Sequence, residues 1–145
     1  MNMKKIRIFA FFILLVVVSF SNLLFADNDI KIIIDGNQTS FYPNPIIENG
    51  TTLVPMRDSF EALGCRIYWK QETRSAIAVR SNTSIKVTID SNEAFVNGNK
   101  LYLSTVPKII GESTYVPLRF ISEALGAKVE WNGNTRTITI LDKTN

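Results

Sequence analysis

The sequence contains no histidine and only one cysteine, Cys65, among its 145 residues. Without an imidazole there is no Ser–His pair, no histidine base and no histidine metal ligand. A single cysteine forms neither an intrachain disulfide nor a zinc–thiolate cluster, and no glycine-rich phosphate-binding motif is present. We therefore predict a protein that is not an enzyme, with no catalytic residue, no bound metal and no cofactor.

The N-terminal segment, residues 1–26, has the pattern of a secretory signal peptide. Three basic residues precede an apolar run over residues 8–18, and Ala26 stands before a polar segment. This pattern favours cleavage after Ala26. The alternative is a retained membrane anchor, since the segment approaches the ~20 residues that span a bilayer. Both alternatives place the protein outside the cytoplasm, either secreted or at the cell envelope.

The charge of the chain is balanced once the signal segment is set aside. Three of the 16 basic residues lie in that segment, so residues 27–145 carry 13 basic and 13 acidic side chains. A neutral domain offers no electrostatic argument for binding nucleic acid. Its length is that of one domain.

A set of short motifs occurs twice in the sequence. Each residue of the second occurrence follows its counterpart in the first by the same number of positions, which is the separation between Pro55 and Pro117. We call this separation the repeat offset. When residues 31–79 are paired with residues 93–141 in this way, 15 of the 49 positions are identical. We interpret this as an internal duplication. Each half is close to the lower size limit for a core of its own, so the two copies are predicted to share one core within residues 30–142. The recurring residues are Pro55, Arg57, Glu61, Gly64, Trp69 and Arg74 in the first copy, and Pro117, Arg119, Glu123, Gly126, Trp131 and Arg136 in the second.

Strands are predicted from turn dipeptides and from alternation. Asp-Gly at 35–36 and Asn-Gly at 97–98 are typical of two-residue hairpin turns, because both central positions of such a turn need a positive φ. Between the copies, apolar and polar residues alternate over 85–89, which predicts a half-exposed strand that pairs with residues 94–96.

Each copy also predicts one short helix. Pro55 and Pro117 suit the first helical position, where a missing N–H costs nothing, and Gly64 and Gly126 end each helix in the left-handed conformation. The sum is an α+β fold, with an antiparallel sheet of short strands and two short helices packed on it.

The strand after each helix carries a tryptophan. Trp69 and Trp131 alternate with the neighbouring residues onto a face of small and aliphatic side chains, which predicts that both rings are buried in the core. The next strand differs between copies, because the large side chains over 75–79 stand one position away from those over 137–141. A β-bulge is one explanation.

The motif arginines have two interpretations. Arg57 and Glu61 are four residues apart on one predicted helix, as are Arg119 and Glu123, a spacing that brings the side chains together. Arginines such as Arg74 and Arg136 could grip an anionic ligand or could tie each helix to the neighbouring turn. Their presence in both copies favours the structural interpretation, because a constraint of the fold must be met twice.

Exposed aromatic rings are the remaining candidates for ligand contact. Tyr68 is predicted to lie on the strand face opposite Trp69, and Phe41, Tyr42 and Tyr102 are predicted to be exposed as well. Such rings could stack on a sugar. The alternative is that they are scattered surface aromatics without a role.

These residues together resemble a known family. The doubled unit, with Asn-Gly, Val-Pro-Leu-Arg, Glu-Ala-Leu-Gly, Trp and Thr-Arg, is similar to the copper amine oxidase N-terminal-like domain, also called a stalk domain, over residues 30–142. Met56 departs from the usual leucine. The resemblance implies a small α+β module of exported bacterial proteins, often placed beside enzymatic or wall-binding domains. It does not imply the part of an amine oxidase that holds copper, and no functional residue is carried over.

Two functions follow as expectations. The first is a secreted or envelope-associated interaction module without catalytic activity, with another envelope protein as partner. The second is a carbohydrate- or peptidoglycan-binding module that uses Tyr42, Tyr68 and Tyr102 on a cell-wall glycan. A membrane is a partner only if the signal segment is retained, and nucleic acid is not expected.

Overall fold

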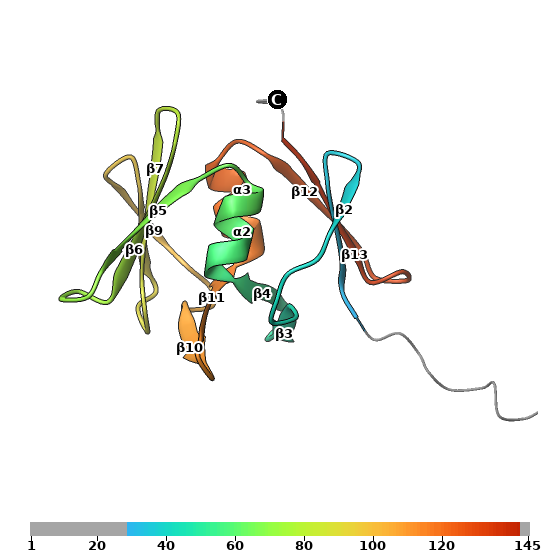
Figure 1. The fold of residues 1–145 in the computed structure, drawn as a ribbon, viewed down its shortest axis with the longest axis horizontal. Helices are drawn as coiled ribbons and strands as arrows, with labels where there is room; N and C mark the ends of the chain where they lie inside the picture. Colours follow the sequence, from blue (N-terminus) through green and yellow to red (C-terminus); the bar gives the residue numbers. More distant parts are fainter. Residues whose placement is uncertain (1–28, 143–145) are drawn as a thin grey trace, which may run out of the picture.

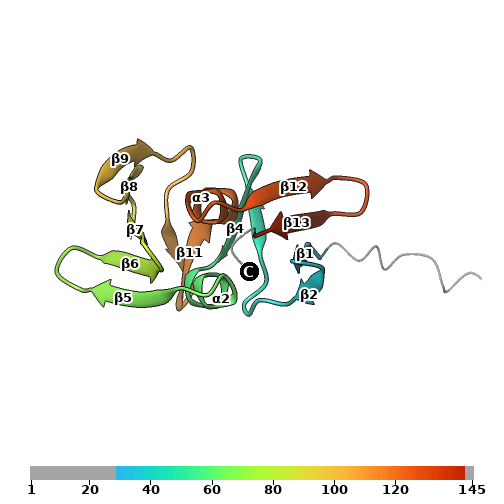
Figure 2. The ribbon, with the colours of Figure 1, turned by 90° about the horizontal axis from the view of Figure 1, so that it is seen from above.

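A computed structural model describes residues 29–142 of the chain. The predicted signal segment, residues 1–26, lies outside the described residues. Two seven-residue helices lie side by side between two outer sheets, and a third sheet closes one end (Figure 1). Figure 2 shows the same arrangement from above, with the helices between the outer sheets. The described residues therefore have the predicted α+β composition, mostly antiparallel strands with two short helices.

The described residues form short strands around the two helices. In chain order the elements are β1 (Lys31–Ile34), β2 (Asn37–Thr39), β3 (Ile46–Glu48), β4 (Thr51–Pro55), α2 (Met56–Ala62), β5 (Arg66–Lys70), β6 (Ser75–Arg80), β7 (Thr83–Thr88), β8 (Glu93–Val96), β9 (Asn99–Tyr102), β10 (Lys108–Ile110), β11 (Ser113–Pro117), α3 (Leu118–Ala124), β12 (Lys128–Asn132) and β13 (Thr137–Leu141). Two stretches match at the repeat offset, since β4, α2 and β5 are followed by β11, α3 and β12 of the same lengths.

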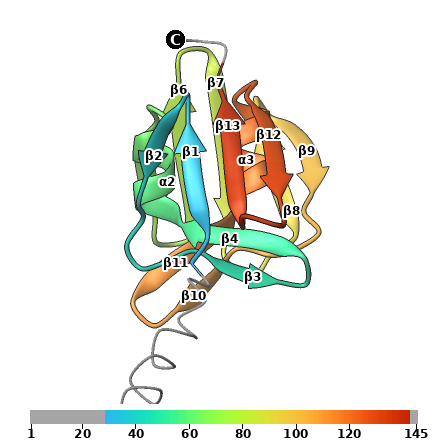
Figure 3. The same cartoon turned by 90° about the vertical axis from the view of Figure 1, so that its right-hand side faces the viewer.

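The strands form three sheets where a single sheet was predicted. The terminal sheet has the order β12-β13-β1-β2, the central sheet β10-β11-β4-β3, and the five-stranded sheet β5-β6-β7-β8-β9. One pair, β1 and β13, is parallel. Figure 3 shows these two strands side by side in the terminal sheet. The other strand pairs of the described residues are antiparallel.

The central sheet relates the two halves of the molecule. In the pairing of β4 with β11, Val54 lies opposite Val116, its equivalent at the repeat offset. Equivalent positions that face each other in an antiparallel pair are related by a local two-fold axis. The helices follow this symmetry, because α2 packs against β11 and α3 packs against β4.

Both outer sheets combine strands from the two halves. The terminal sheet joins β1 and β2 to β12 and β13, and the five-stranded sheet joins β5 and β6 to β8 and β9 through β7. One buried cluster likewise contains residues from both halves, from Ile32 to Ile140. The predicted pairing of residues 85–89 with 94–96 is confirmed, since Ile85 lies opposite Val96.

The β-bulge considered as one explanation for the strand over 75–79 is absent. Residues Arg66–Lys70 pair without interruption with residues from Val79 to Ser75. Ala76 and Ala78 face the core, with 1% and 0% of their surfaces exposed. Ile77 and Val79 therefore point to the opposite face of the sheet.

The position of strand β7 explains why β6 places alanines toward the core. It lies between β6 and β8 and buries Ile85 and Val87. In the terminal sheet β13 pairs directly with β1, and the positions equivalent to Ala76 and Ala78 are Ile138 and Ile140, both buried. Interiors are close-packed, so the extra strand is accommodated by smaller side chains on its neighbour.

The turn and cap predictions are confirmed by the backbone. Asp35 and Gly36 have φ values of 49° and 83°, as a type I′ hairpin turn requires. Gly64 and Gly126 follow the two helices with φ values of 72° and 88°. The prolines stand one position earlier than predicted, because each is the last residue of a strand, and the helices begin at Met56 and Leu118.

The prediction of buried tryptophans is wrong. Trp69 and Trp131 are 41% and 43% exposed. Each lies on an edge strand, β5 or β12, so a neighbouring strand covers only one side of the ring. Phe41 was predicted to be exposed and is instead buried in the core.

A single arginine joins the C-terminal ends of both helices. Arg80 Nη1 donates to the carbonyl oxygen of Leu63 at 2.9 Å, and Nη2 donates to that of Leu125 at 2.8 Å. These two leucines are the C-caps of α2 and α3. Arg80 also forms an ion pair with Asp142, whose side chain is 5% exposed. Because positions 80 and 142 are themselves one repeat offset apart, the two charges face each other across the local two-fold axis.

Candidate functional site

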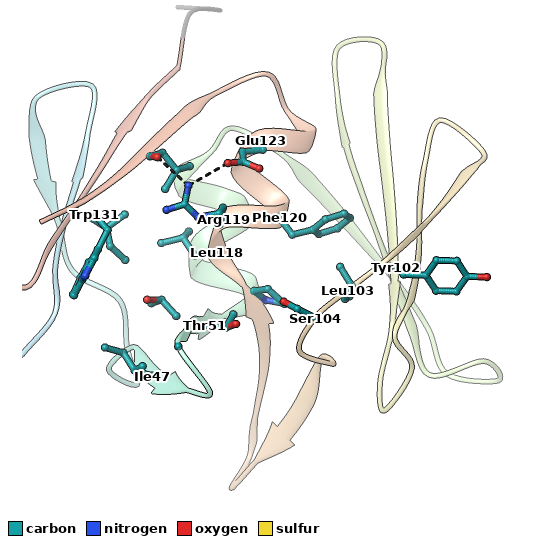
Figure 4. Close-up of a pocket in the computed structure, with 15 residues that line it drawn as sticks. Ile47, Thr51, Tyr102, Leu103, Ser104, Leu118, Arg119, Phe120, Glu123 and Trp131 are labelled. Atoms are coloured by element: carbon teal, nitrogen blue, oxygen red, sulfur yellow. Dashed lines mark hydrogen bonds and ion pairs between the residues drawn. The ribbon is translucent and has the colours of Figure 1, made fainter. Parts of the chain in front are cut away.

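A groove of about 510 Å³ lies beside α3 (Figure 4). Its walls come from α3 and β12, from the β3–β4 hairpin and from the segment after β9. The lining residues are Ile47, Gly50, Thr51, Thr52, Tyr102, Leu103, Ser104, Pro117, Leu118, Arg119, Phe120, Glu123, Val129, Trp131 and Ile138. An apolar floor with a few polar groups at its edge is typical of a ligand site.

The polar groups of this groove are held in place by defined contacts. Arg119 Nη1 donates to Glu123 Oε1 at 3.3 Å and to the carbonyl oxygen of Val129 at 3.1 Å. The second bond ties α3 to β12. Within residues 29–142, Nε and Nη2 of Arg119 have no hydrogen-bond partner, and its side chain is 55% exposed. The guanidinium therefore keeps N–H donors available to a ligand.

A second groove, of about 530 Å³, lies beside α2. Its lining includes Met56, Arg57, Glu61, Ile67, Trp69 and Thr114, which stand in the same relation as Leu118, Arg119, Glu123, Val129, Trp131 and Thr52 in the first groove. The tryptophan, arginine and glutamate of each groove come from one half, and the threonine comes from the other. The sequence motifs marked these residues, but burial of the tryptophan was expected and the threonine contact was not.

The two grooves differ in one charged contact. In the first, Arg119 and Glu123 form an ion pair at the helical spacing of four residues. In the second, Arg57 and Glu61 both line the groove, but within residues 29–142 they form no such pair. The second groove also has Cys65 and Arg66 on its wall.

The other motif arginines lie outside both grooves. Arg74 Nη1 pairs with Asp90 Oδ2 at 3.2 Å, and the Arg74 carbonyl accepts from the Ile89 N–H at 3.0 Å. The Arg136 carbonyl accepts from the Lys31 N–H at 2.9 Å, and its buried Nε has no hydrogen-bond partner within the described residues. Arg74 thus holds its turn to the segment after β7, and no hydrogen bond joins it to the helices in the described part of the chain.

The three candidate tyrosines do not form one platform. Tyr42, Tyr68 and Tyr102 are 86%, 54% and 70% exposed. Tyr68 and Tyr102 lie on β5 and β9, the two edges of the five-stranded sheet, so four strand spacings, roughly 19 Å, separate them. Tyr42 lies in the segment between β2 and β3, and Figure 4 shows the Tyr102 ring pointing away from the rest of the groove.

Cys65 has the environment of an unreactive thiol. Its side chain is 7% exposed. Burial raises the pKa of the thiol above its ordinary value of 9.0, although the nearby Arg80 charge acts in the opposite direction. The thiolate, which is the nucleophilic form, is therefore disfavoured at neutral pH.

The described residues contain neither a metal-binding cluster nor a membrane-spanning helix. Over residues 29–142 there is no cluster of three or more His, Cys, Asp or Glu side chains placed to hold a metal ion. Neither of the helices in this part of the chain has the length and apolar character needed to cross a bilayer.

Comparisons with known proteins agree with the fold and the motifs. A sequence profile described as "Copper amine oxidase N-terminal domain" matches residues 33–140. A curated relative named "Protease inhibitor", from Brevibacillus choshinensis, is 32% identical over 95 residues, which cover 64% of this chain and 28% of that protein. The matched region is thus less than a third of that relative's length.

Proposed function

This chain belongs to the copper amine oxidase N-terminal domain family, and from that premise we propose that it is an exported, non-catalytic module that binds an envelope partner through its two grooves. The signal-peptide pattern of residues 1–26 supports export. The observation that carries the proposal is the pair of grooves, because each places an exposed indole ring beside charged groups and a hydroxyl.

The two related grooves lead to a second part of the proposal. Residues 31–79 and 93–141 are two copies of one unit that fold around a shared core. Support comes from the 15 identical residues among 49 paired positions, and from the strand–helix–strand segments that recur at the repeat offset. The pairing of Val54 with Val116 supports it further.

The alternative function is binding of a cell-wall glycan. The half-exposed rings of Trp69 and Trp131 favour this candidate, because sugar rings stack on aromatic faces while neighbouring polar groups bond to their hydroxyls. In the first groove Arg119, Glu123 and Thr52 supply such groups. In this candidate function the tryptophans, and not the three tyrosines, are the rings that stack on the sugar.

The test uses the purified chain from residue 27 onward. Trp131→Ala and Trp69→Ala are compared with Tyr42→Ala, which removes an 86% exposed ring that lies outside both grooves. Retention on purified cell wall by the parent protein and the Tyr42 variant, reduced about tenfold or more in the Trp131 variant, would support glycan binding; a tenfold loss corresponds to ~1.4 kcal/mol.

Absence of retention on the wall would remove the glycan candidate and leave a protein partner. Crosslinking on intact cells then identifies that partner. Equal crosslinking by the parent and by a variant with both tryptophans replaced would show that the grooves are not the binding site. The relative's name, "Protease inhibitor", adds one arm to this experiment, in which the purified chain is titrated against secreted proteases and inhibition would identify the partner as a protease.

A further inference from the structure

The outer face of the five-stranded sheet carries a continuous row of large side chains. In the strand register Tyr68 lies opposite Ile77, Ile77 opposite Lys86, Lys86 opposite Phe95, and Phe95 opposite Lys100. Residues that pair directly share a face, so the row crosses the sheet from β5 to β9. The helices cover the other face of this sheet, as Figure 1 shows.

This outer face has an excess of positive charge. Alternation along the strands places four basic side chains on it, Arg66, Lys70, Lys86 and Lys100, and one acidic side chain, Glu93. Lys100 Nζ pairs with Glu93 Oε1 at 2.9 Å. Within residues 29–142 the other three basic groups have no acidic partner. The face thus carries a net charge of about +3 on a domain whose mature sequence is neutral.

The aromatic and basic groups of this face are close to one another. The ammonium groups of Lys86 and Lys100 lie 5.5 Å and 5.9 Å from the centre of the Phe95 ring. A shallow hollow of about 280 Å³ adjoins them, lined by Ile77, Ser84, Lys86, Phe95 and Gly98. Exposed tyrosines stand at both edges, with Tyr68 at 54% and Tyr102 at 70% exposure.

The terminal sheet shows that the fold does not require this row. The terminal sheet has an equivalent cross-strand row, at the positions that the repeat offset pairs with Tyr68, Ile77, Phe95 and Lys100. The residues of this row are Glu130, Thr139, Ile33 and Gln38. That row has no aromatic ring and no basic residue. A requirement of the fold would act on both sheets, so the basic and aromatic row is a property of one surface.

We propose that the outer face of the five-stranded sheet binds a linear anionic wall polymer, made of polyol or sugar units joined by phosphodiesters. Its basic side chains are spread over several strands. Lys86 and Lys100 lie two strands apart, so their backbone positions are separated by roughly 10 Å. Distributed charges match a chain of phosphates better than one small anion. Ammonium groups bind phosphates as point charges, and the rings offer apolar faces to the units between them.

The choice of a wall polymer as occupant rests on the proposed export of the chain. The binding itself is tested in solution, so failure of binding and failure of export are separate results. The probe is purified poly(glycerol phosphate), titrated into the chain from residue 27 onward and followed by calorimetry. With three phosphates neutralised, affinity is expected to fall roughly 20-fold between 50 and 200 mM salt, by the slope known for single-stranded polyanions.

The variants form a matched pair. Lys86→Glu lies in the row and is expected to weaken binding at least tenfold. Lys128→Glu changes the net charge equally but lies on the outer face of the terminal sheet, at the position equivalent to Arg66, and should stay within twofold of the parent. Lys86→Gln, which adds no negative charge, is expected to weaken binding less than Lys86→Glu and reports on the same site should the glutamate variant fail to fold.

Three results would overturn the proposal. The first is equal loss of affinity in the Lys86 and Lys128 variants, which would reduce the effect to net charge. The second is loss of polymer binding in Trp131→Ala, which would assign the polymer to the groove. The third is equal or tighter binding of a single-stranded DNA of matched charge, which would identify a nucleic acid surface instead. Binding of the polymer that is lost with Lys86 alone and is not shared by the DNA supports it.

Discussion

Replacement of Arg80 is expected to be strongly destabilising. The substitution Arg80→Met keeps much of the apolar side chain but removes the guanidinium that bonds to Leu63 and Leu125 at 2.9 Å and 2.8 Å. It also breaks the ion pair between Arg80 and the Asp142 carboxylate, whose side chain is 5% exposed.

The magnitude follows from these contacts. Hydrogen bonds to a charged group contribute ~1.5–3 kcal/mol each, and breaking a buried ion pair from one side costs ~3–5 kcal/mol. These contributions overlap because they belong to one side chain, so we expect a loss of ~3–5 kcal/mol in the free energy of unfolding. For a domain of this size that corresponds to a decrease of roughly 12–20 °C in Tm.

Two double variants test the reason for the loss. Arg80→Met with Asp142→Leu removes both charges and is expected to recover most of the stability, because the carboxylate no longer has to be buried without the Arg80 charge beside it. Arg80→Asp with Asp142→Arg exchanges the charges across the local two-fold axis. The new arginine should reach the same two helix ends, so the exchange should be more stable than Arg80→Asp alone.

Thermal and urea unfolding, followed by circular dichroism, provide the measurement. A loss below ~1 kcal/mol in Arg80→Met would place the pair among weak surface contacts and refute the reasoning. An exchanged pair no better than the single Arg80→Asp change would argue against the two-fold relation of these positions.

Three further changes have defined outcomes. Gly126→Val should destabilise the fold by ~1–2 kcal/mol or more through its φ of 88° alone, because no atom lies within 4 Å of an added Cβ; unchanged unfolding in urea would refute the cap. Trp131→Ala should cost ~2 kcal/mol, about half the value for a fully buried ring, since the ring is 43% exposed; a loss above ~4 kcal/mol by the same measurement would restore the buried interpretation. Burial raises the pKa of Cys65 above 9.0, so the folded state retains the thiol proton longer and stability falls as pH rises above that value. Cys65→Ala, which copies Ala127 of the other half, should make the urea midpoint less dependent on pH above about 9; an unchanged slope would show that the thiol does not contribute.

Local features were predictable from the sequence because their causes are local. The dipeptides at 35–36 and 97–98 fix their turns through backbone conformation, and Gly64 and Gly126 end their helices for the same reason. The repeated motifs also located both helices to within one residue. None of these depends on which strands become neighbours.

The errors concern features that depend on sheet order. The alternation of β5 and β12 identified the face on which Trp69 and Trp131 lie, but it does not show that both strands are edges, and an edge leaves part of the ring exposed. The large side chains over residues 75–79 stand one position away from those over 137–141 because β7 lies beside β6, and the sequence pattern does not show this neighbour. Three sheets arise instead of one because each half contributes strands to both outer sheets, which a strand pattern read along the chain does not reveal.

The role of Arg80 was missed for a related reason. Its position and that of Asp142 lie just beyond the aligned blocks and share neither residue type nor charge. The available signal was the opposite charge at two positions separated by the repeat offset. Two identical charged residues that meet at a two-fold axis would repel each other. Opposite charges at two such equivalent positions therefore indicate a contact between them.

The parallel pairing of β1 with β13 has a mechanical consequence. The chain enters β1 at Lys31 and leaves β13 at Leu141, and the register from Lys31↔Thr137 to Ile34↔Ile140 places these points at opposite ends of the pair. Tension applied through both ends would pull the two strands lengthwise past each other, so that the bonds of the ladder share the load and do not open one after another. A module anchored at one end and loaded at the other would resist extension through this pair of parallel strands. A hairpin pulled from its open end, by contrast, would lose its hydrogen bonds one after another.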